Sequence, residues 1–284
     1  LFDGAKSDVY QACFVTAGRK EMETRDIIAA IGEADLVLVG LGEEFDGGRE
    51  LKTCPEYLRG LELMREAGIG WLEPAWAEYC LAKSGWSIEA ALEKLAVLLE
   101  DKNYFIVSTA MNRRIELKQW KQNRVVMPCG SNRKKQCSGG CGQTPINLEE
   151  RDEKVLLEVF EGLTQGKLTG DRASMLGVCP ACGARMVLNT VHTDDYDEKG
   201  YLEQWQLYTK WLQGTLNKNL TVLELGVGMR YPTVIRWPFE KVVFFNKKAR
   251  LVRVNESLYQ LTEELSGKGC GIPRNGVEWL ENLC

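Results

Sequence analysis

The segment ADLVLVGLGEEFDGG, residues 34–48, decides the fold class of this chain. Leu36 to Val39 form a continuous apolar run that ends at Gly40, which is typical of a strand buried on both faces of a parallel sheet. The same pattern returns in NYFIVSTA (103–110), NRVVM (123–127), LTVLELGVG (220–228) and ARLVRVN (249–255). Because helical patterns separate these runs, the sequence predicts an α/β fold with a layered parallel sheet.

The helical patterns are clearest between residues 50 and 100, where three helices are predicted. In the last of these, Ile88, Leu92, Leu95 and Leu99 recur at helical spacing. Three tryptophans fall in this region, Trp71, Trp76 and Trp86. We predict that they form the core of a small helical module, since indoles bury large areas; the alternative is that they line an acyl or lipoyl channel.

Composition limits the function classes. Hydrophobic residues make up 44% and charged residues 27% of the 284 residues, as in an ordinary globular protein. The 36 basic and 40 acidic residues give a net charge of −4, which argues against a general nucleic-acid binder. No apolar run is long enough to cross a bilayer, and we expect a cytoplasmic protein with neither a membrane nor a nucleic acid as partner.

Ten cysteines stand in the chain, and four of them form two close-spaced pairs. Cys137 and Cys141 lie in a Gly/Ser-rich turn, and Cys179 and Cys182 lie in the sequence CPACG. Two thiolate pairs on tight turns complete a tetrahedral zinc site, and four thiolates leave no open position for catalysis. The sequence therefore predicts one structural zinc ion, whose negative ligand charge the basic run 133–135 would offset; the alternative is a set of unrelated free thiols.

These signals divide the chain, which exceeds the size at which one hydrophobic core usually stops growing. The predicted parts are three pieces of a sheet domain (residues 1–44, 101–130 and 213–284), a helical insertion (45–100) and a zinc-binding module (131–212).

Two glycine pairs end predicted strands: Gly40 and Gly42 after the first, and Gly226 and Gly228 after LTVLEL. Glycine at such a point lets the backbone approach a phosphate and present its amide groups. Asn255 ends a later strand and is placed to hydrogen-bond a ribose hydroxyl. The pattern predicts a Rossmann-like domain that holds a dinucleotide; the alternative is ordinary tight turns without a ligand.

Together these features resemble the sirtuin family, most closely its bacterial, macrodomain-linked class M branch. The resemblance runs from about residue 34 to 255 and is strongest over LELGVGMRYPTVIRWPFEKV, residues 223–242. It implies a Rossmann domain that binds NAD and a cysteine module that carries structural zinc. It also implies cleavage of nicotinamide from NAD and transfer of ADP-ribose to an acyl-lysine or a protein side chain, and it adds Thr109 to the expected NAD contacts.

The chain departs from the family pattern at three places. Glu43 and Glu44 follow the first glycine pair, where the family has a small residue or serine, and buried carboxylates would repel a pyrophosphate. Arg49, Arg113 and Arg114 are the nearest candidates to neutralise them. In STAMN, Ala110 and Asn112 replace an asparagine and an aspartate of the family pattern. Cys129 stands where the family has its catalytic histidine or glutamine.

The resemblance therefore makes Cys129 and Asn112 the candidate catalytic residues. We interpret Cys129 as a buried filler rather than a nucleophile, since no histidine stands near it to activate its thiol. The single histidine, His192, could pair with Asp194 or Asp195 as a proton carrier, but we interpret it as a surface residue of a polar loop.

Two functions follow from the sequence. The first is a sirtuin-like, NAD-dependent protein deacylase or protein ADP-ribosyltransferase, with impaired catalysis and with an acyl- or lipoyl-protein as candidate substrate. The second is a non-catalytic module that binds NAD, ADP-ribose or a partner protein.

Overall fold

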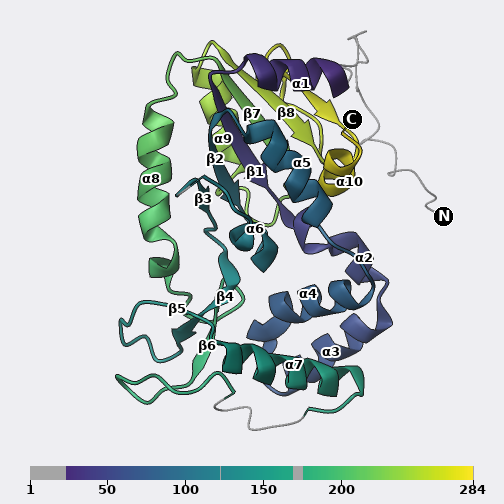
Figure 1. Cartoon of the computed structure of the whole chain (residues 1–284), viewed down its shortest axis with the longest axis vertical. Helices are drawn as coiled ribbons and strands as arrows, with labels where there is room; N and C mark the ends of the chain where they lie inside the picture. Colours follow the sequence, from purple (N-terminus) through teal and green to yellow (C-terminus); the bar gives the residue numbers. More distant parts are fainter. Residues whose placement is uncertain (1–23, 122, 169–174, 284) are drawn as a thin grey trace, which may run out of the picture.

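The structure is a computed structural model, and it describes residues 24–121, 123–168 and 175–283 (Figure 1). Its larger part is a parallel sheet with helices on both faces, and its smaller part combines helices with a short antiparallel sheet. The predicted α/β fold with a Rossmann-like sheet is confirmed. Among the described residues, no helix combines the length and the apolar character needed to span a bilayer.

The large sheet has six strands in the order β3-β2-β1-β7-β8-β9, and every neighbouring pair is parallel. The strands are β1 (Leu36–Leu41), β2 (Asn103–Ser108), β3 (Val125–Val126), β7 (Leu220–Leu225), β8 (Ala249–Val254) and β9 (Gly269–Ile272). The chain moves outward from β1 to β3 and then starts again on the other side of β1 with β7. This reversal is a topological switch point, and in open α/β sheets ligands bind beside the carboxyl ends of the strands at such a point.

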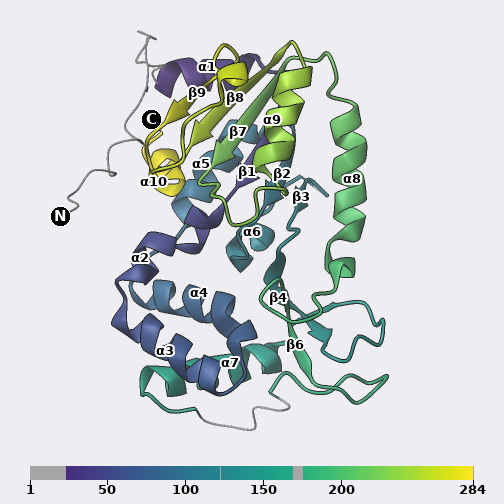
Figure 2. The same cartoon turned by 180° about the vertical axis from the view of Figure 1, so that it is seen from behind.

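Side chains alternate between the two faces of this sheet. Val37 and Val39 point into a core formed with α1, α5 and α10, whereas Leu36 and Leu38 point into a core formed with α8 and α9. The helices are α1 (Thr24–Glu33), α5 (Glu89–Leu99), α8 (Leu202–Gln213), α9 (Arg236–Phe245) and α10 (Gly276–Glu281). Figure 1 shows α5 in front of the sheet, and the reverse view in Figure 2 shows α9 in front of it. Burial on both faces explains why the strands read as uninterrupted apolar runs.

The smaller part has a core of its own. Buried side chains of α3 (Pro55–Glu66), α4 (Glu73–Lys83) and α7 (Glu150–Thr164) pack there against β6 (Met186–Thr190). Trp71 and Trp76 belong to this core, which agrees with their prediction as core residues. The helical insertion and the cysteine module thus share one core, while α5 packs on the large sheet. The domain boundaries themselves stay a prediction.

The second sheet was not predicted. Residues 131–190 read as turns around one helix, but they contain a three-stranded antiparallel sheet in the order β5-β4-β6. Its remaining strands are β4 (Gly130–Cys137) and β5 (Ile146–Asn147). The remaining helices are short: α2 (Gly48–Lys52), α6 (Arg113–Leu117) and the 3-10 helices Glu43–Asp46, Gly70–Leu72, Glu198–Gly200 and Glu263–Leu265.

A buried ion pair links two central strands of the large sheet. Glu224 of β7 and Arg253 of β8 are register partners, and their side chains are almost fully buried. Arg253 donates from Nε to Glu224 Oε1 at 2.7 Å and from Nη2 to Oε2 at 3.0 Å. The arginine also pairs with Glu240 of α9 at 2.8 Å. Because both charges lie away from water, each depends on the other for its hydrogen bonds.

We expect Glu224→Gln to destabilise the protein by about 3–5 kcal/mol, since it leaves a buried guanidinium without its bidentate carboxylate. Urea unfolding followed by tryptophan fluorescence measures the change. The matched control is Glu256→Gln, which removes an exposed partner of Arg49 and should cost less than about 1 kcal/mol. Equal effects of the two substitutions would contradict a special role for the buried pair.

Candidate functional site at the carboxyl edge of the sheet

The loops that follow β1 and β7 meet at the switch point of the sheet. The Gly42 amide donates to the carbonyl of Leu225 at 2.9 Å, and the Glu44 amide donates to the carbonyl of Gly226 at 3.3 Å. A Cβ atom on Gly42 would lie 2.2 Å from the Cα of Val227, so only glycine fits there. Gly226 has a φ of +62°, in the left-handed region that glycine adopts without strain. The two glycine pairs thus allow the loops to pack backbone against backbone.

Glu43 and Glu44 bind the backbone amides that surround this contact. The Gly228 amide donates to Glu43 Oε2 at 2.6 Å. The Glu256 amide donates to Glu44 Oε1 at 3.0 Å, and the Gly276 amide donates to Glu44 Oε2 at 2.5 Å. These amides come from the loop after β7, the loop after β8 and the start of α10. Two carboxylates of the chain therefore occupy donors of the kind that a Rossmann site offers to a phosphate.

The arginines predicted to neutralise these carboxylates pair elsewhere. Arg49 forms ion pairs with Glu256 and Glu278, Arg113 with Glu78, and Arg114 with Glu89. Burial raises the pKa of Glu44, while the amides of Glu256 and Gly276 and the nearby charge of Arg49 act in the opposite direction. Backbone amides, and not arginine side chains, hold the two glutamates.

The other predicted NAD contacts lie along the same edge. Gly40 is the fifth residue of β1, and Thr109 follows β2 with its amide bonded to the Leu41 carbonyl at 2.9 Å. Asn255 follows β8, but both ends of its side chain already hydrogen-bond to backbone groups. Its Nδ2 donates to the Val227 carbonyl, and its Oδ1 accepts from the amides of Ser257 and Leu258. Asn255 therefore links its own loop to the loop after β7, and its role toward a ribose stays a prediction.

Cys129 lies between β3 and β4 and is 2% exposed. Burial raises the pKa of its thiol to about 12, and the nearby carboxylates of Asp46 and Glu43 act in the same direction. Arg230 acts in the opposite direction. A thiol with such a pKa stays protonated at neutral pH, which favours a buried filler over a nucleophile.

The second catalytic candidate, Asn112, caps a helix. Its Oδ1 accepts from the Arg114 amide at 3.0 Å at the start of α6, and its Nδ2 donates to the Phe45 carbonyl at 3.4 Å. Both ends of the side chain are thus engaged with backbone, as is typical of an N-cap residue. A catalytic role for Asn112 stays a prediction.

Asp46 is a candidate that the sequence reasoning missed. Both of its carboxylate oxygens accept from the Met111 amide at 3.1 Å, and Oδ1 also accepts from the Asn112 amide at 3.1 Å. Burial raises the pKa of Asp46 to about 7, with help from the charges of Glu78 and Glu43. An acid with a pKa near the working pH is suited to proton transfer. Its position in the loop that follows β1 was the signal available in the sequence.

His192 was interpreted as a surface residue, and this interpretation is wrong. Its side chain is 8% exposed, and Nδ1 lies 3.2 Å from Glu73 Oε2. Its Nε2 lies 3.1 Å from Nη2 of Arg230, in the loop between β7 and α9. The hydroxyl of Tyr57 donates to the other oxygen of Glu73 at 3.3 Å. His192 thus links the smaller part of the molecule to the loop that begins at the second glycine pair, and its partner is not Asp194 or Asp195.

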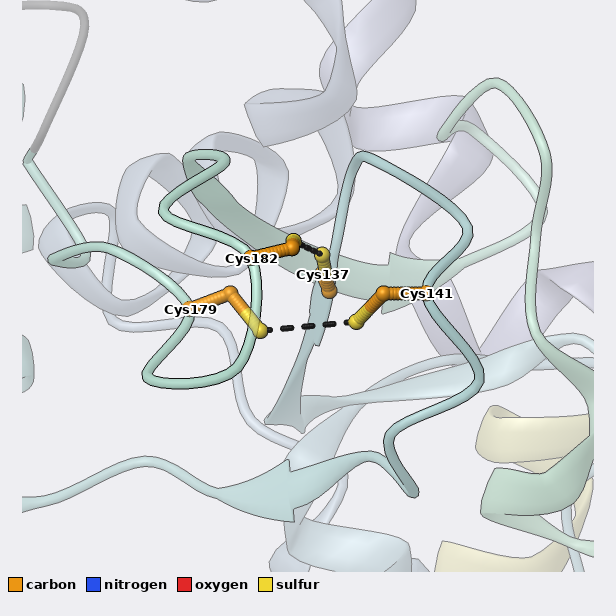
Figure 3. A group of neighbouring side chains, drawn as sticks. All are labelled: Cys137, Cys141, Cys179 and Cys182. Carbon is orange, nitrogen blue, oxygen red and sulfur yellow. Dashed lines mark hydrogen bonds between the residues drawn. The ribbon is translucent and has the colours of Figure 1, made fainter.

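The two cysteine pairs converge into one cluster (Figure 3). The four sulfur atoms of Cys137, Cys141, Cys179 and Cys182 all lie within 4.8 Å of one another. Cys137 and Cys182 are 3.4 Å apart at sulfur, and Cys141 and Cys179 are 3.5 Å apart, too far for a disulfide. Four thiolates in this arrangement suit a tetrahedral zinc ion.

The lysines expected to offset the charge of this cluster have other partners. Lys135 is buried, and its Nζ donates to Asp152 Oδ2 at 2.6 Å. Lys134 donates to the Gly200 carbonyl at 2.8 Å and lies 3.5 Å from Glu116. An amide supports the cluster directly, since Gly139 N–H donates to Cys137 Sγ at 3.3 Å.

Comparison with known proteins places this architecture in a fold family. No family model matches the chain. It is 20% identical over 283 residues to a protein ADP-ribosyltransferase of Staphylococcus aureus (strain Mu50), covering 92% of this chain and 86% of the relative. Over 138 residues it is 26% identical to a probable bifunctional ADP-ribose hydrolase/ADP-ribosyltransferase of Fusarium oxysporum f. sp. cubense, covering 48% of this chain and 23% of that protein.

Solved structures give the fold. A Sir2 protein bound to a propionylated peptide matches with a TM-score of 0.51 and 13% identity, covering 91% of this chain and 96% of that one. A complex of Sir2, a p53 peptide and NAD+ matches with a TM-score of 0.50 and 12% identity over the same shares. The chain has the sirtuin fold, and the predicted resemblance to sirtuins is confirmed at this level.

The raised pKa of Asp46 predicts a pH-dependent contribution to stability. Between the usual pKa of 3.8 and the folded value of about 7, the folded state binds more protons than the unfolded state. The stability that Asp46 contributes is therefore complete below about pH 4 and is lost as the pH rises through 7.

Asp46→Asn keeps the side chain neutral at every pH. The difference in unfolding free energy between variant and wild type should shift in favour of the variant by on the order of 1–3 kcal/mol between pH 5 and pH 8. Urea unfolding at several pH values measures it, with the exposed Asp35→Asn as the matched control. A difference that does not change with pH would contradict the raised pKa.

Proposed function

We propose that the protein is a sirtuin-like, NAD-dependent protein ADP-ribosyltransferase. The observation that carries the proposal is the meeting of the β1 and β7 loops at the switch point of a sheet with the sirtuin fold. The curated relatives favour ADP-ribosyl transfer over deacylation, because both are named for the former activity. NAD would lie across these two loops, and the acceptor would be a protein side chain.

In this proposal Asp46 supplies the base that Cys129 cannot supply. The acceptor oxygen or nitrogen forms a bond to the ribose carbon as the bond from that carbon to nicotinamide breaks, and nicotinamide leaves as a neutral molecule. The proton of the acceptor passes to the Asp46 carboxylate, which is available near neutral pH because its pKa is about 7. Cys129 fills space beside it as a neutral thiol.

One observation favours a second function, that of a non-catalytic module. Glu43 and Glu44 already bind the amides of Gly228, Glu256 and Gly276, so a diphosphate must displace them to reach these donors. If they are never displaced, the protein holds at most a part of NAD. The two functions therefore differ in whether the carboxylates limit NAD binding.

The variant Glu43→Ala/Glu44→Ser tests this difference. Removing two carboxylates that compete for the diphosphate donors should strengthen NAD binding by on the order of 1–3 kcal/mol, or about 5- to 150-fold. Isothermal titration calorimetry measures the affinity, and transfer of labelled ADP-ribose to acceptor proteins measures the activity. The matched control is Glu62→Ala/Glu66→Ser, which removes two exposed charges from α3.

Label transfer by the wild type, abolished by Asp46→Asn, is the outcome that the proposal expects. Tighter NAD binding by the double variant without transfer in either protein would support the non-catalytic module. Unchanged or weaker NAD binding by the variant would remove the main support for a dinucleotide at this edge.

We also propose that Cys137, Cys141, Cys179 and Cys182 hold one structural zinc ion. The residues fit such a metal because four thiolates converge and leave no position for substrate. Zinc would stabilise the turns that carry the cysteines and the sheet beside them.

Metal analysis of the purified protein should give about one zinc per chain. Cys182→Ser should lose that zinc and lower the melting temperature by roughly 5–10 °C, since binding of a structural metal contributes to folding. Cys270→Ser is the control, because Cys270 lies on β9 outside the cluster. Full zinc content and an unchanged melting temperature in Cys182→Ser would refute the ligand set.

A further inference from the structure

A pocket of about 320 Å³ lies beside the candidate site without being part of it. It is bordered by the segment from α6 to β3, by the start of β4 and by the start of α8, which lie together in Figure 1. Gly130, which follows Cys129, contributes to its wall. The residues that hold Glu43 and Glu44 do not line it, so this pocket is separate from the amides of the switch point.

The lining of this pocket is strongly basic, although the chain as a whole carries a net charge of −4. Its cations are Lys118, Lys121, Arg124 and Lys134, and its one carboxylate is Glu116. Glu116 is engaged already, because it accepts from the Ser131 hydroxyl at 2.6 Å and lies 3.5 Å from Lys134. A concave surface with an excess of one charge attracts ligands of the opposite charge.

Three of these cations have no carboxylate to balance them in the described part of the chain, and one of the three, Lys121, donates instead to the Lys102 carbonyl at 2.9 Å. Among the described residues, no acidic oxygen lies within ion-pair distance of Lys118 or Arg124, and both side chains are only half-buried. Most other half-buried basic groups near the candidate site are paired, as Arg113 is with Glu78. Lys118 and Arg124 are thus available to an anion that enters the pocket.

Two aromatic rings complete the lining, and contacts outside the pocket hold both in place. Trp120 donates from Nε1 to the Ile115 carbonyl at 2.7 Å. Tyr201 stacks on Tyr196 with ring centroids 6.3 Å apart and also packs against Trp205. Rings that are fixed before a ligand arrives offer flat surfaces at a low entropic cost.

We propose that this pocket binds a nucleoside monophosphate or a ligand of the same chemistry. The phosphate would lie against Lys118 and Arg124, and the base would lie on the rings of Trp120 and Tyr201. A volume of about 320 Å³ is at the lower end of small-molecule sites and suits one nucleotide better than a dinucleotide. The proposal does not depend on NAD binding at the carboxyl edge.

The test is calorimetric titration of the full chain with AMP at low ionic strength. Lys118→Ala/Arg124→Ala should weaken AMP binding by at least about 10-fold, because it removes the two cations proposed to hold the phosphate. Lys247→Ala/Lys248→Ala removes two exposed lysines elsewhere and should leave AMP binding unchanged. Adenosine and inorganic phosphate should each bind at least about 10-fold more weakly than AMP, since each lacks one half of the ligand.

NAD binding separates this proposal from the proposed function. Lys118→Ala/Arg124→Ala should retain the NAD affinity of the wild type. Absence of saturable binding at millimolar AMP, or equal AMP binding by wild type and the Lys118/Arg124 variant, would overturn the site. Equal affinities for AMP and inorganic phosphate would overturn the nucleotide assignment, because the rings would then contribute nothing.

Discussion

The arrangement of the carboxyl edge depends on the hydrogen bonds that Glu43 and Glu44 accept from three separate backbone segments. Amides that end parallel strands, or begin a helix, are left without a partner by the regular structure, and they need an acceptor. In a nucleotide-binding sheet a phosphate can be that acceptor. Here the carboxylates of Glu43 and Glu44 are the acceptors, and they hold together the loops after β1, β7 and β8. A dinucleotide that binds at this edge would therefore have to displace the Glu43 and Glu44 carboxylates from these amides.

Burial at the same edge has different consequences for Cys129 and Asp46. Burial disfavours the charged form of both side chains, but the consequence differs because their ordinary pKa values differ. The pKa of the Cys129 thiol rises far above neutral pH, so the thiol stays protonated and unreactive. The pKa of the Asp46 carboxyl rises from 3.8 to about 7, so this group can exchange a proton near neutral pH. This part of the molecule therefore keeps a carboxyl group that titrates near neutral pH beside a thiol that does not.

The fold could be read from the sequence where burial is uniform. The strands of the large sheet are buried on both faces, so Leu36 to Val39 and their counterparts stood out as apolar runs. The antiparallel sheet could not be read in this way, because β4 contains Arg133, Lys134 and Lys135. Lys135 is buried, and Asp152 of α7 pairs with it across the smaller core. His192 was misread for a similar reason, since Glu73 and Arg230 lie far from it in the sequence.

These long-range contacts also connect the cysteine cluster to the candidate site. Cys137 ends β4, whose first residues follow Cys129, and β6 leads from the second cysteine pair to His192. Pairing of the two strands is irregular between Gly130 and Lys135, but they meet again near the large sheet, where the backbone of Val191 donates to the carbonyl of Cys129 at 3.0 Å. A metal that fixes the four cysteines would therefore fix the far ends of the two strands whose near ends carry Cys129 and His192. Through His192, which contacts Arg230, such a metal would also be connected to the loop between β7 and α9.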